Sequence, residues 1–162
     1  GKGVKGMALL ELKVNGVGHR VKAEAATTLL SVLREQIGLT GVKCGCNEGQ
    51  CGSCTVLLDG AAFRSCLVPA VKVGAREVTT IEGLAARGKL HPVQQAFLDL
   101  SAFQCGFCTP GMILRGVALL EEIPQPSAAQ VKSALEGNLC RCGTYPRIVE
   151  AVRLAARGGS RG

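Results

Sequence analysis

The sequence predicts an α+β protein in which a small mixed unit of strands and one helix is followed by a group of helices. Three observations lead to this prediction: the length of 162 residues, strand and turn signals confined to the first half, and helical periodicity in the second half. A chain of this length holds one hydrophobic core or two small ones. We place the boundary between the two parts in residues 74–89, and expect domains over residues 7–82 and 88–158.

The composition narrows the possible classes of protein. Apolar residues make up 47% and charged residues 19% of the chain, which excludes disorder, and no apolar run approaches the ~18 residues of a membrane span. Aromatic residues are only 3%, so a stacking surface for nucleic acid is not expected. Nine locally spaced cysteines favour metal or cluster ligation over a secreted disulfide framework. We therefore expect a soluble, cytoplasmic protein without a targeting segment, and leave residues 1–6 outside the fold.

The first half begins with signals for a β-hairpin. Strands are predicted over residues 9–14 and 17–23, on either side of the Asn15-Gly16 turn pair. Apolar residues then recur at helical spacing, which predicts a helix over residues 29–36. The hairpin and the helix together form the start of the mixed unit.

A loop rich in cysteine and glycine, residues 41–52, separates this helix from a further strand over residues 55–58 and a turn at Asp59-Gly60. The second half has helical periodicity, with prolines and a serine at positions suited to helix starts. Its predicted helices span residues 92–100, 110–122, 127–135 and 146–156.

Three cysteines in the glycine-rich loop, with a fourth downstream, form the most specific motif of the sequence. Their spacing of C-x4-C-x2-C is the plant-type pattern for a 2Fe-2S cluster. Loop glycines let the chain approach a cluster closely and aim N–H groups at its sulfurs. Zinc is the alternative, but structural zinc usually uses C-x2-C pairs. The predicted ligands are Cys46, Cys51, Cys54 and Cys66.

Cys44 competes with Cys46 for the first ligand position. The use of Cys44 would lengthen the first gap to six residues, so the spacing rule favours Cys46. We expect Cys44 to be a buried small hydrophobe or an unused thiol.

A second set of four cysteines lies in the predicted helical half. Cys108 directly precedes one predicted helix and Cys142 lies shortly before another, so both pairs are expected at positive helix N-termini that suit an anionic cluster. On spacing alone, zinc and a cluster are equally good interpretations; beside the first set, a second cluster is the simpler one. The predicted ligands are Cys105, Cys108, Cys140 and Cys142.

The motifs around both sets closely resemble those of one known family, the iron-sulfur small subunits of molybdenum hydroxylases of the xanthine oxidase family. The matching segments are residues 45–56 (GCNEGQCGSCTV), 104–112 (QCGFCTPGM) and 137–142 (GNLCRC). The resemblance implies two 2Fe-2S clusters, the first in a ferredoxin-like β-grasp domain and the second in a four-helix bundle. It covers the chain from about Leu9 to Ala156.

The resemblance also implies an electron relay between other subunits. Electrons would come from a molybdopterin cofactor in a separate large subunit, enter through the second cluster and leave through the first, toward a flavin (FAD) subunit, a cytochrome or another acceptor. Gln104 matches the position that hydrogen-bonds the pterin, and Cys142 is expected against it. No residue of this chain would touch substrate, and neither nucleic acid nor a membrane span is expected.

One departure from the common family pattern bears on substrate. Many relatives continue the last motif as Cys-Arg-Cys-Thr-Gly-Tyr, whereas residues 140–146 here read CRCGTYP, an order that resembles the branch acting on aldehydes or N-heteroaromatic compounds. Carbon monoxide and aryl-CoA enzymes share the pattern and stay as alternatives. Two rivals from other classes are a free-standing ferredoxin, and a zinc adaptor binding nucleic acid through Arg141, Arg147, Arg153, Arg157 and Arg161.

Overall fold

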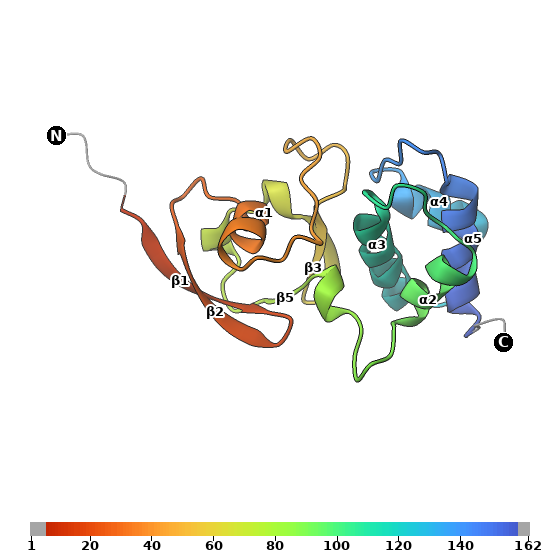
Figure 1. Cartoon of the computed structure of the whole chain (residues 1–162), viewed down its shortest axis with the longest axis horizontal. Helices are drawn as coiled ribbons and strands as arrows, with labels where there is room; N and C mark the ends of the chain where they lie inside the picture. Colours follow the sequence, from red (N-terminus) through yellow and green to blue (C-terminus); the bar gives the residue numbers. More distant parts are fainter. Residues whose placement is uncertain (1–5, 159–162) are drawn as a thin grey trace.

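The computed structural model describes residues 6–158, which form a sheet half and a helical half side by side (Figure 1). Residues 1–5 of the segment expected outside the fold, and Arg161, lie outside the described residues. The prediction of a mixed α+β protein is confirmed. No helix within the described range is long and apolar enough to cross a membrane.

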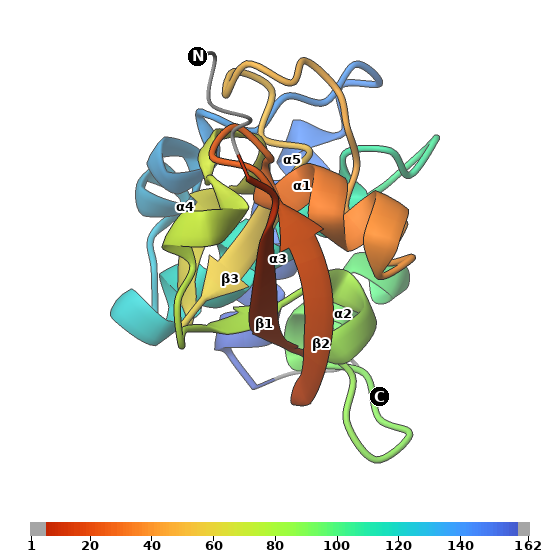
Figure 2. The same ribbon diagram turned by 90° about the vertical axis from the view of Figure 1, so that its left-hand side faces the viewer.

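Five strands make one sheet in the order β2-β1-β5-β3-β4. Its strands are β1 (Ala8–Val14), β2 (Val17–Ala23), β3 (Thr55–Leu58), β4 (Ala61–Arg64) and β5 (Glu77–Thr79). The predicted hairpin is present, with β1 and β2 antiparallel around Asn15-Gly16, and both turn residues have positive φ. It forms the end of the molecule that faces away from the helices (Figure 2).

The first predicted helix is a single α-helical turn, α1 (Leu29–Ser31), which continues as a π-helix, η1 (Val32–Gln36). The side chain of Thr28 accepts a hydrogen bond from the backbone N–H of Ser31 and so caps the first turn. Leu29 and Leu33 are fully buried against the sheet. This helix therefore closes the core of the sheet half.

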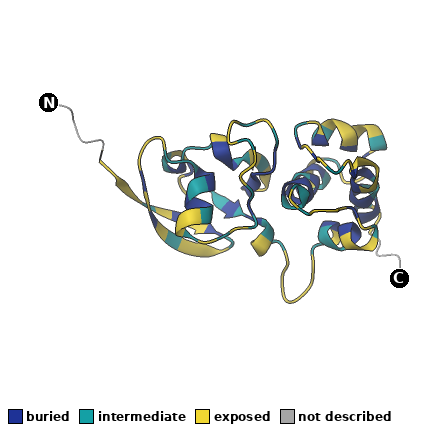
Figure 3. Cartoon of the chain, turned by 45° about the horizontal axis from the view of Figure 1, so that its top comes forward, coloured by how far each residue is buried: buried dark blue, intermediate teal, exposed yellow. Residues whose placement is uncertain are grey.

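The segment 74–89 contains structure that the sequence analysis does not predict. It contributes β5, which pairs in parallel with β1 and antiparallel with β3, and a 3-10 turn, η4 (Ile81–Gly83). β4 is also not predicted. Beyond η4, residues 85–90 are all exposed and connect the two halves (Figure 3).

Four helices build the second half around a common hydrophobic core that includes Phe97, Met112 and Ile148. Two of them begin with a capping box, in which His91 and Ser127 bond to the first turn. Each lies within one residue of the predicted bounds. They are α2 (Pro92–Asp99), α3 (Thr109–Glu122), α4 (Ala128–Leu135) and α5 (Tyr145–Ala156).

Strand β3 lies between the two hydrophobic cores, and all four of its residues are buried. Val56 and Leu58 belong to the core of the sheet half, whereas Leu57 belongs to the core of the helical half. Successive side chains of a strand point to opposite faces, so one strand supplies both cores. This arrangement fixes the helices against the sheet and brings the cysteine-bearing loops together.

Candidate metal centres

The loops that carry the two cysteine sets lie at the same end of the molecule (Figure 1). The glycine-rich loop precedes β3, while the second set lies in the segments that lead into α3 and α5. The backbone N–H of Leu139 donates to the carbonyl oxygen of Cys51 at 2.9 Å. Because Leu139 directly precedes Cys140, this hydrogen bond joins a residue of the first set to the neighbour of a residue of the second.

Backbone N–H groups converge on Cys46. Its Sγ accepts from the N–H groups of Cys51 and Gln50, each at 3.3 Å, and of Glu48 at 3.4 Å. These donors, with Cys51 contributing most, lower the pKa of Cys46 to about 6. The close wrapping requires glycine at position 45, where an added Cβ would lie 2.7 Å from the Sγ of Cys51. The loop is thus built to hold an anionic sulfur.

The remaining two cysteines of the first set lie beneath this loop. Cys54 precedes β3 and Cys66 lies in a 3-10 turn, η2 (Ser65–Leu67), directly after β4; both are buried. Burial raises the pKa of Cys66 to about 11, with further contributions from a hydrogen bond to Cys54 and from the charges of Cys54 and Cys46, while the N–H of Gly49 acts in the opposite direction. The predicted four thiols therefore converge, and they fit a group that binds sulfur ligands from several sides.

Cys44 is exposed, so the expectation of a buried small hydrophobe is wrong for this residue. Among the described residues, no hydrogen bond involves its side chain. The role of an unused thiol is consistent with this position.

The second set lies at the beginnings of two helices, as the sequence predicts. Cys108 is the N-cap residue of α3, and the Sγ of Cys140 lies 3.3 Å from the Oγ1 of Thr144, the N-cap residue of α5. Cys105 is exposed and Cys142 is half-buried. Positive helix ends favour bound negative charge, which suits thiolate ligands.

The thiols of the second set influence one another. Burial raises the pKa of Cys108 to about 12, followed by a hydrogen bond to Cys140 and the charges of Cys140 and Cys105. Burial also acts to raise the pKa of Cys140, but hydrogen bonds from Thr144, Cys108 and the backbone of Cys142 outweigh it and lower the pKa to about 7. Three sulfurs and one cysteine backbone group therefore meet between α3 and α5.

One cavity of 440 Å³ connects the two sets. Its lining includes Cys46 and Cys51 of the first set and Cys105, Cys108 and Cys140 of the second. Within residues 6–158, no group of three or more His, Cys, Asp or Glu side chains is arranged to hold a metal ion. The cysteines instead surround the shared cavity from both halves.

Further residues, not identified from the sequence, hold the halves together beside this cavity. The amide of Asn138 donates to the carbonyl oxygen of Gly52 at 3.1 Å, and the guanidinium of Arg64 donates to the carbonyl oxygen of Gly137 at 3.0 Å. Tyr145 accepts a hydrogen bond from the N–H of Cys140 at 2.7 Å. Gly137 and Asn138 lie in the GNLCRC motif, which was the available signal.

Gln104 is exposed, in the segment between α2 and α3, and adjoins Cys105. Its side chain has no hydrogen-bond partner among the residues that the structure describes. The structure therefore places this amide at the surface next to the second cysteine set.

Comparisons with known proteins agree with this arrangement. Residues 12–82 match the 2Fe-2S iron-sulfur cluster binding domain, and residues 80–153 match a second family, the [2Fe-2S] binding domain. One of the subunits of nicotinate dehydrogenase from Pseudomonas putida is 50% identical over 91% of this chain and 94% of its own length. The aldehyde oxidoreductase iron-sulfur-binding subunit PaoA of Escherichia coli is 43% identical over 91% of this chain and 71% of its own length.

A solved structure is similar over nearly the whole chain. A chain of quinoline 2-oxidoreductase from Pseudomonas putida 86 superposes with a TM-score of 0.86 and 42% identity, over 94% of this chain and 98% of its own length. The resemblance inferred from the motifs is confirmed. The chain belongs to the iron-sulfur small subunits of the xanthine oxidase family of molybdenum hydroxylases.

Proposed function

We propose that this chain relays electrons from a molybdopterin site in a large partner subunit to a flavin or another external acceptor. The observation that carries the proposal is the single cavity lined by both cysteine sets, with the hydrogen bond from Leu139 to Cys51 beside it. This arrangement provides two neighbouring redox positions in one chain. The membership in the family of small subunits provides the direction, in through the second set and out through the first.

We assign one 2Fe-2S cluster to Cys46, Cys51, Cys54 and Cys66 and another to Cys105, Cys108, Cys140 and Cys142. The clusters supply one-electron redox chemistry when bound. The chain positions their ligands: the backbone N–H groups around Cys46 stabilise its thiolate, and Thr144 orients Cys140. The two matched 2Fe-2S domain families support this assignment.

We further infer that residues 7–82 form a ferredoxin-like β-grasp domain and residues 88–158 a four-helix bundle. The two separate hydrophobic cores and the exposed connection at residues 85–90 support this division. Leu57 is the exception, because it extends from the sheet half into the core of the helical half. A free-standing ferredoxin would need only the first of these domains.

Contact with the molybdopterin of the large subunit is assigned to Gln104 and Cys142. The exposure of Gln104 beside Cys105 supports this role, because a side-chain amide can both donate to and accept from the edge of a pterin. A flavin subunit or a cytochrome is the proposed acceptor of electrons. Nine free cysteines suit a reducing compartment, which supports a cytoplasmic location.

The proposed substrate of the assembled enzyme is an aldehyde or an N-heteroaromatic compound. Relatives named for nicotinate, aldehyde, isoquinoline and nicotine enzymes support this range, as does the order of residues 140–146. A carbon monoxide or aryl-CoA enzyme is the alternative. The substrate is bound by the large subunit, so this chain does not select between them.

Metal analysis of the purified chain tests the proposal most directly. We expect about four irons and four acid-labile sulfides per chain, with two distinct 2Fe-2S signals in electron paramagnetic resonance after reduction. Copurification with a large molybdopterin-binding chain is expected when the neighbouring genes are expressed together. Stoichiometric zinc without visible absorbance would overturn the assignment.

A further inference from the structure

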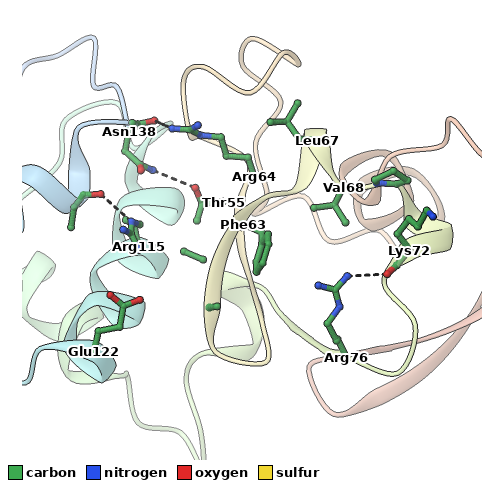
Figure 4. A pocket seen from close by; sticks show the side chains of 15 residues that line it. Thr55, Phe63, Arg64, Leu67, Val68, Lys72, Arg76, Arg115, Glu122 and Asn138 are labelled. Carbon is green, nitrogen blue, oxygen red and sulfur yellow. Dashed lines mark hydrogen bonds between the residues drawn. The ribbon is translucent and has the colours of Figure 1, made fainter.

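A cleft of 740 Å³ lies between the sheet half and the helical half, away from the cavity that both cysteine sets line (Figure 4). Every residue of β4 contributes to its lining. Because β4 is the last strand in the order β2-β1-β5-β3-β4, the cleft runs along a free edge of the sheet. The function proposed above gives no role to this cleft.

The outer edge of β4 offers unpaired backbone groups. Ser65 donates its N–H to Cys54, and in an antiparallel ladder such bonded pairs alternate with pairs that direct their N–H and C=O groups outward. By this alternation, Ala62 and Arg64 point their backbone groups away from β3. Among the described residues, no hydrogen bond satisfies these groups. Such an edge is a template for an additional strand.

The opposite edge of the sheet shows what a covered edge looks like. On β2, the side-chain amide of Gln36 accepts from the N–H of Lys22 at 2.9 Å and donates to its C=O at 2.7 Å. It occupies the position of a neighbouring strand at that residue. β4 has no comparable cover within the described part of the chain.

The cleft along β4 is strongly basic. Its lining carries the cations Arg64, Lys72, Arg76 and Arg115, against Glu122 as the only carboxylate. None of these four cations forms an ion pair with a described residue. The guanidinium groups instead donate to neutral backbone carbonyls, of Gly137, Val73, Lys72 and Ala134.

The charges flank the strand on both sides. Figure 4 shows Arg115 on the helical side of the strand and Lys72 and Arg76 on the opposite side. Phe63 is 40% exposed on the strand itself, and the guanidinium of Arg76 lies 5.8 Å from the centre of its ring. Positive charge and an exposed aromatic side chain thus accompany the unpaired backbone edge.

We propose that the β4 edge binds an extended acidic segment of a partner polypeptide, which adds a sixth strand to the sheet. Backbone hydrogen bonds to Ala62 and Arg64 would set its register, and its alternating side chains would face Arg115 on one side and Lys72 and Arg76 on the other. Pairing with a second copy of this chain is disfavoured, because it would bring two sets of cations together. The proposal does not depend on which cofactors the cysteines hold.

The location gives the binding a consequence for the cysteine sets. Cys66 follows Arg64 by two residues, in the turn directly after β4. A strand docked on β4 would therefore lie next to the segment that carries one proposed ligand of the first cluster. This cluster is the one assigned to the exit of electrons.

Peptide binding to the purified full chain tests the proposal. The probe is a fluorescent peptide of about six residues, a common strand length, composed of glutamate and valine. The comparison peptides are its lysine and valine counterpart and an acidic peptide with N-methylated backbone amides, which cannot pair as a strand. We expect binding of the acidic peptide only, with an affinity that falls as salt is added. Hydrogen exchange should slow in residues 61–64.

A double variant, Lys72→Glu with Arg76→Gln, should weaken this binding about tenfold. The matched control is Lys22→Glu, an exposed lysine on the opposite edge of the sheet, which should leave the affinity unchanged. Iron content and circular dichroism verify that each variant is folded. Equal binding of the N-methylated peptide, an equal loss in the control, or no binding by the unaltered chain would each overturn the proposal. Dimerisation through β4 would identify a second copy as the occupant instead and would also overturn it.

Discussion

Leu139 and Cys51 are 88 positions apart in the sequence, yet their backbones share a hydrogen bond of 2.9 Å. It joins the loop of the first cysteine set to the segment of the second. The side chain of Leu139 is 54% exposed, so its backbone N–H is the group that matters for this contact. Only a substitution that removes the N–H tests its importance.

Leu139→Pro should slow reduction of the first centre relative to the second, because it removes the direct hydrogen bond between their ligand segments. The lost bond should also cost about 1 kcal/mol of stability. Rapid-mixing absorbance and freeze-quench resonance spectra would measure the two reductions. Leu139→Ala keeps the N–H and is the control; an identical slowing in that variant would contradict the explanation.

Cys46→Ala should reduce the iron content from about four to about two per chain, since it removes a ligand of the first cluster only. Cys44→Ala should retain both clusters, because Cys44 is exposed and the N–H groups of the loop converge on Cys46. Iron analysis and resonance spectra distinguish the variants. Cluster loss in Cys44→Ala, with retention in Cys46→Ala, would reverse the assignment.

Gly52→Ala should disrupt the contact between the halves. An added Cβ would lie 2.5 Å from the carbonyl oxygen of Gly137, and the positive φ of Gly52 adds strain. Gly60→Ala has a similar φ, but nothing lies within 4 Å of its added Cβ, so it isolates the strain of about 1 kcal/mol. Thermal unfolding should show a clearly larger loss for Gly52→Ala. Equal losses would mean that the close approach is relaxed at no cost.

His91 makes stability depend on pH. Burial lowers its pKa below 6.5, against a smaller opposing effect of Glu121, and its Nδ1 accepts from the N–H of Val93. Stability is therefore complete above pH 6.5 and falls as the pH decreases toward the folded pKa, because only the unfolded chain then takes up a proton; below that pKa the loss levels off.

His91→Asn should keep the helix cap without this pH dependence, whereas His91→Ala should lose about 1 kcal/mol at every pH. Thermal unfolding of the three proteins between neutral and mildly acidic pH measures both effects. An unchanged pH profile in His91→Asn would show that another group is responsible.

Gln104→Ala should leave iron content and both resonance signals intact, because Gln104 is exposed and bonds to no described residue. In the assembled enzyme it should slow electron passage from molybdenum to the clusters or loosen the molybdenum cofactor. Rapid-mixing kinetics would then show reduced molybdenum accumulating first. Unchanged reduction rates together with full cofactor retention would make Gln104 an ordinary loop residue.

Elements with strong local signals are found where the sequence predicts them. The Asn15-Gly16 turn and the first-turn prolines of the second half are of this kind, because the conformation they favour does not depend on distant residues. β4 and β5 have no such signal. β5 spans only Glu77–Thr79 and pairs with β1 and β3, so its existence depends on the assembled sheet.

The candidate site divides in the same way. The cysteine spacings identify the eight residues, since ligation by a loop constrains local sequence. The meeting of the two sets depends on Asn138 reaching Gly52 and on Leu139 reaching Cys51, and no periodic pattern encodes contacts over such separations. The exposure of Cys44 likewise depends on how the folded loop turns.

The exposed connection at residues 85–90 carries Arg87 and Lys89, which are both sites for a trypsin-like protease. The two halves are held by Leu57, Arg64 and Asn138 and not by this connection. A chain cut there remains a single particle made of two fragments. Its covalent continuity is thus dispensable after folding, so each half can be isotopically labelled on its own and rejoined by coexpression.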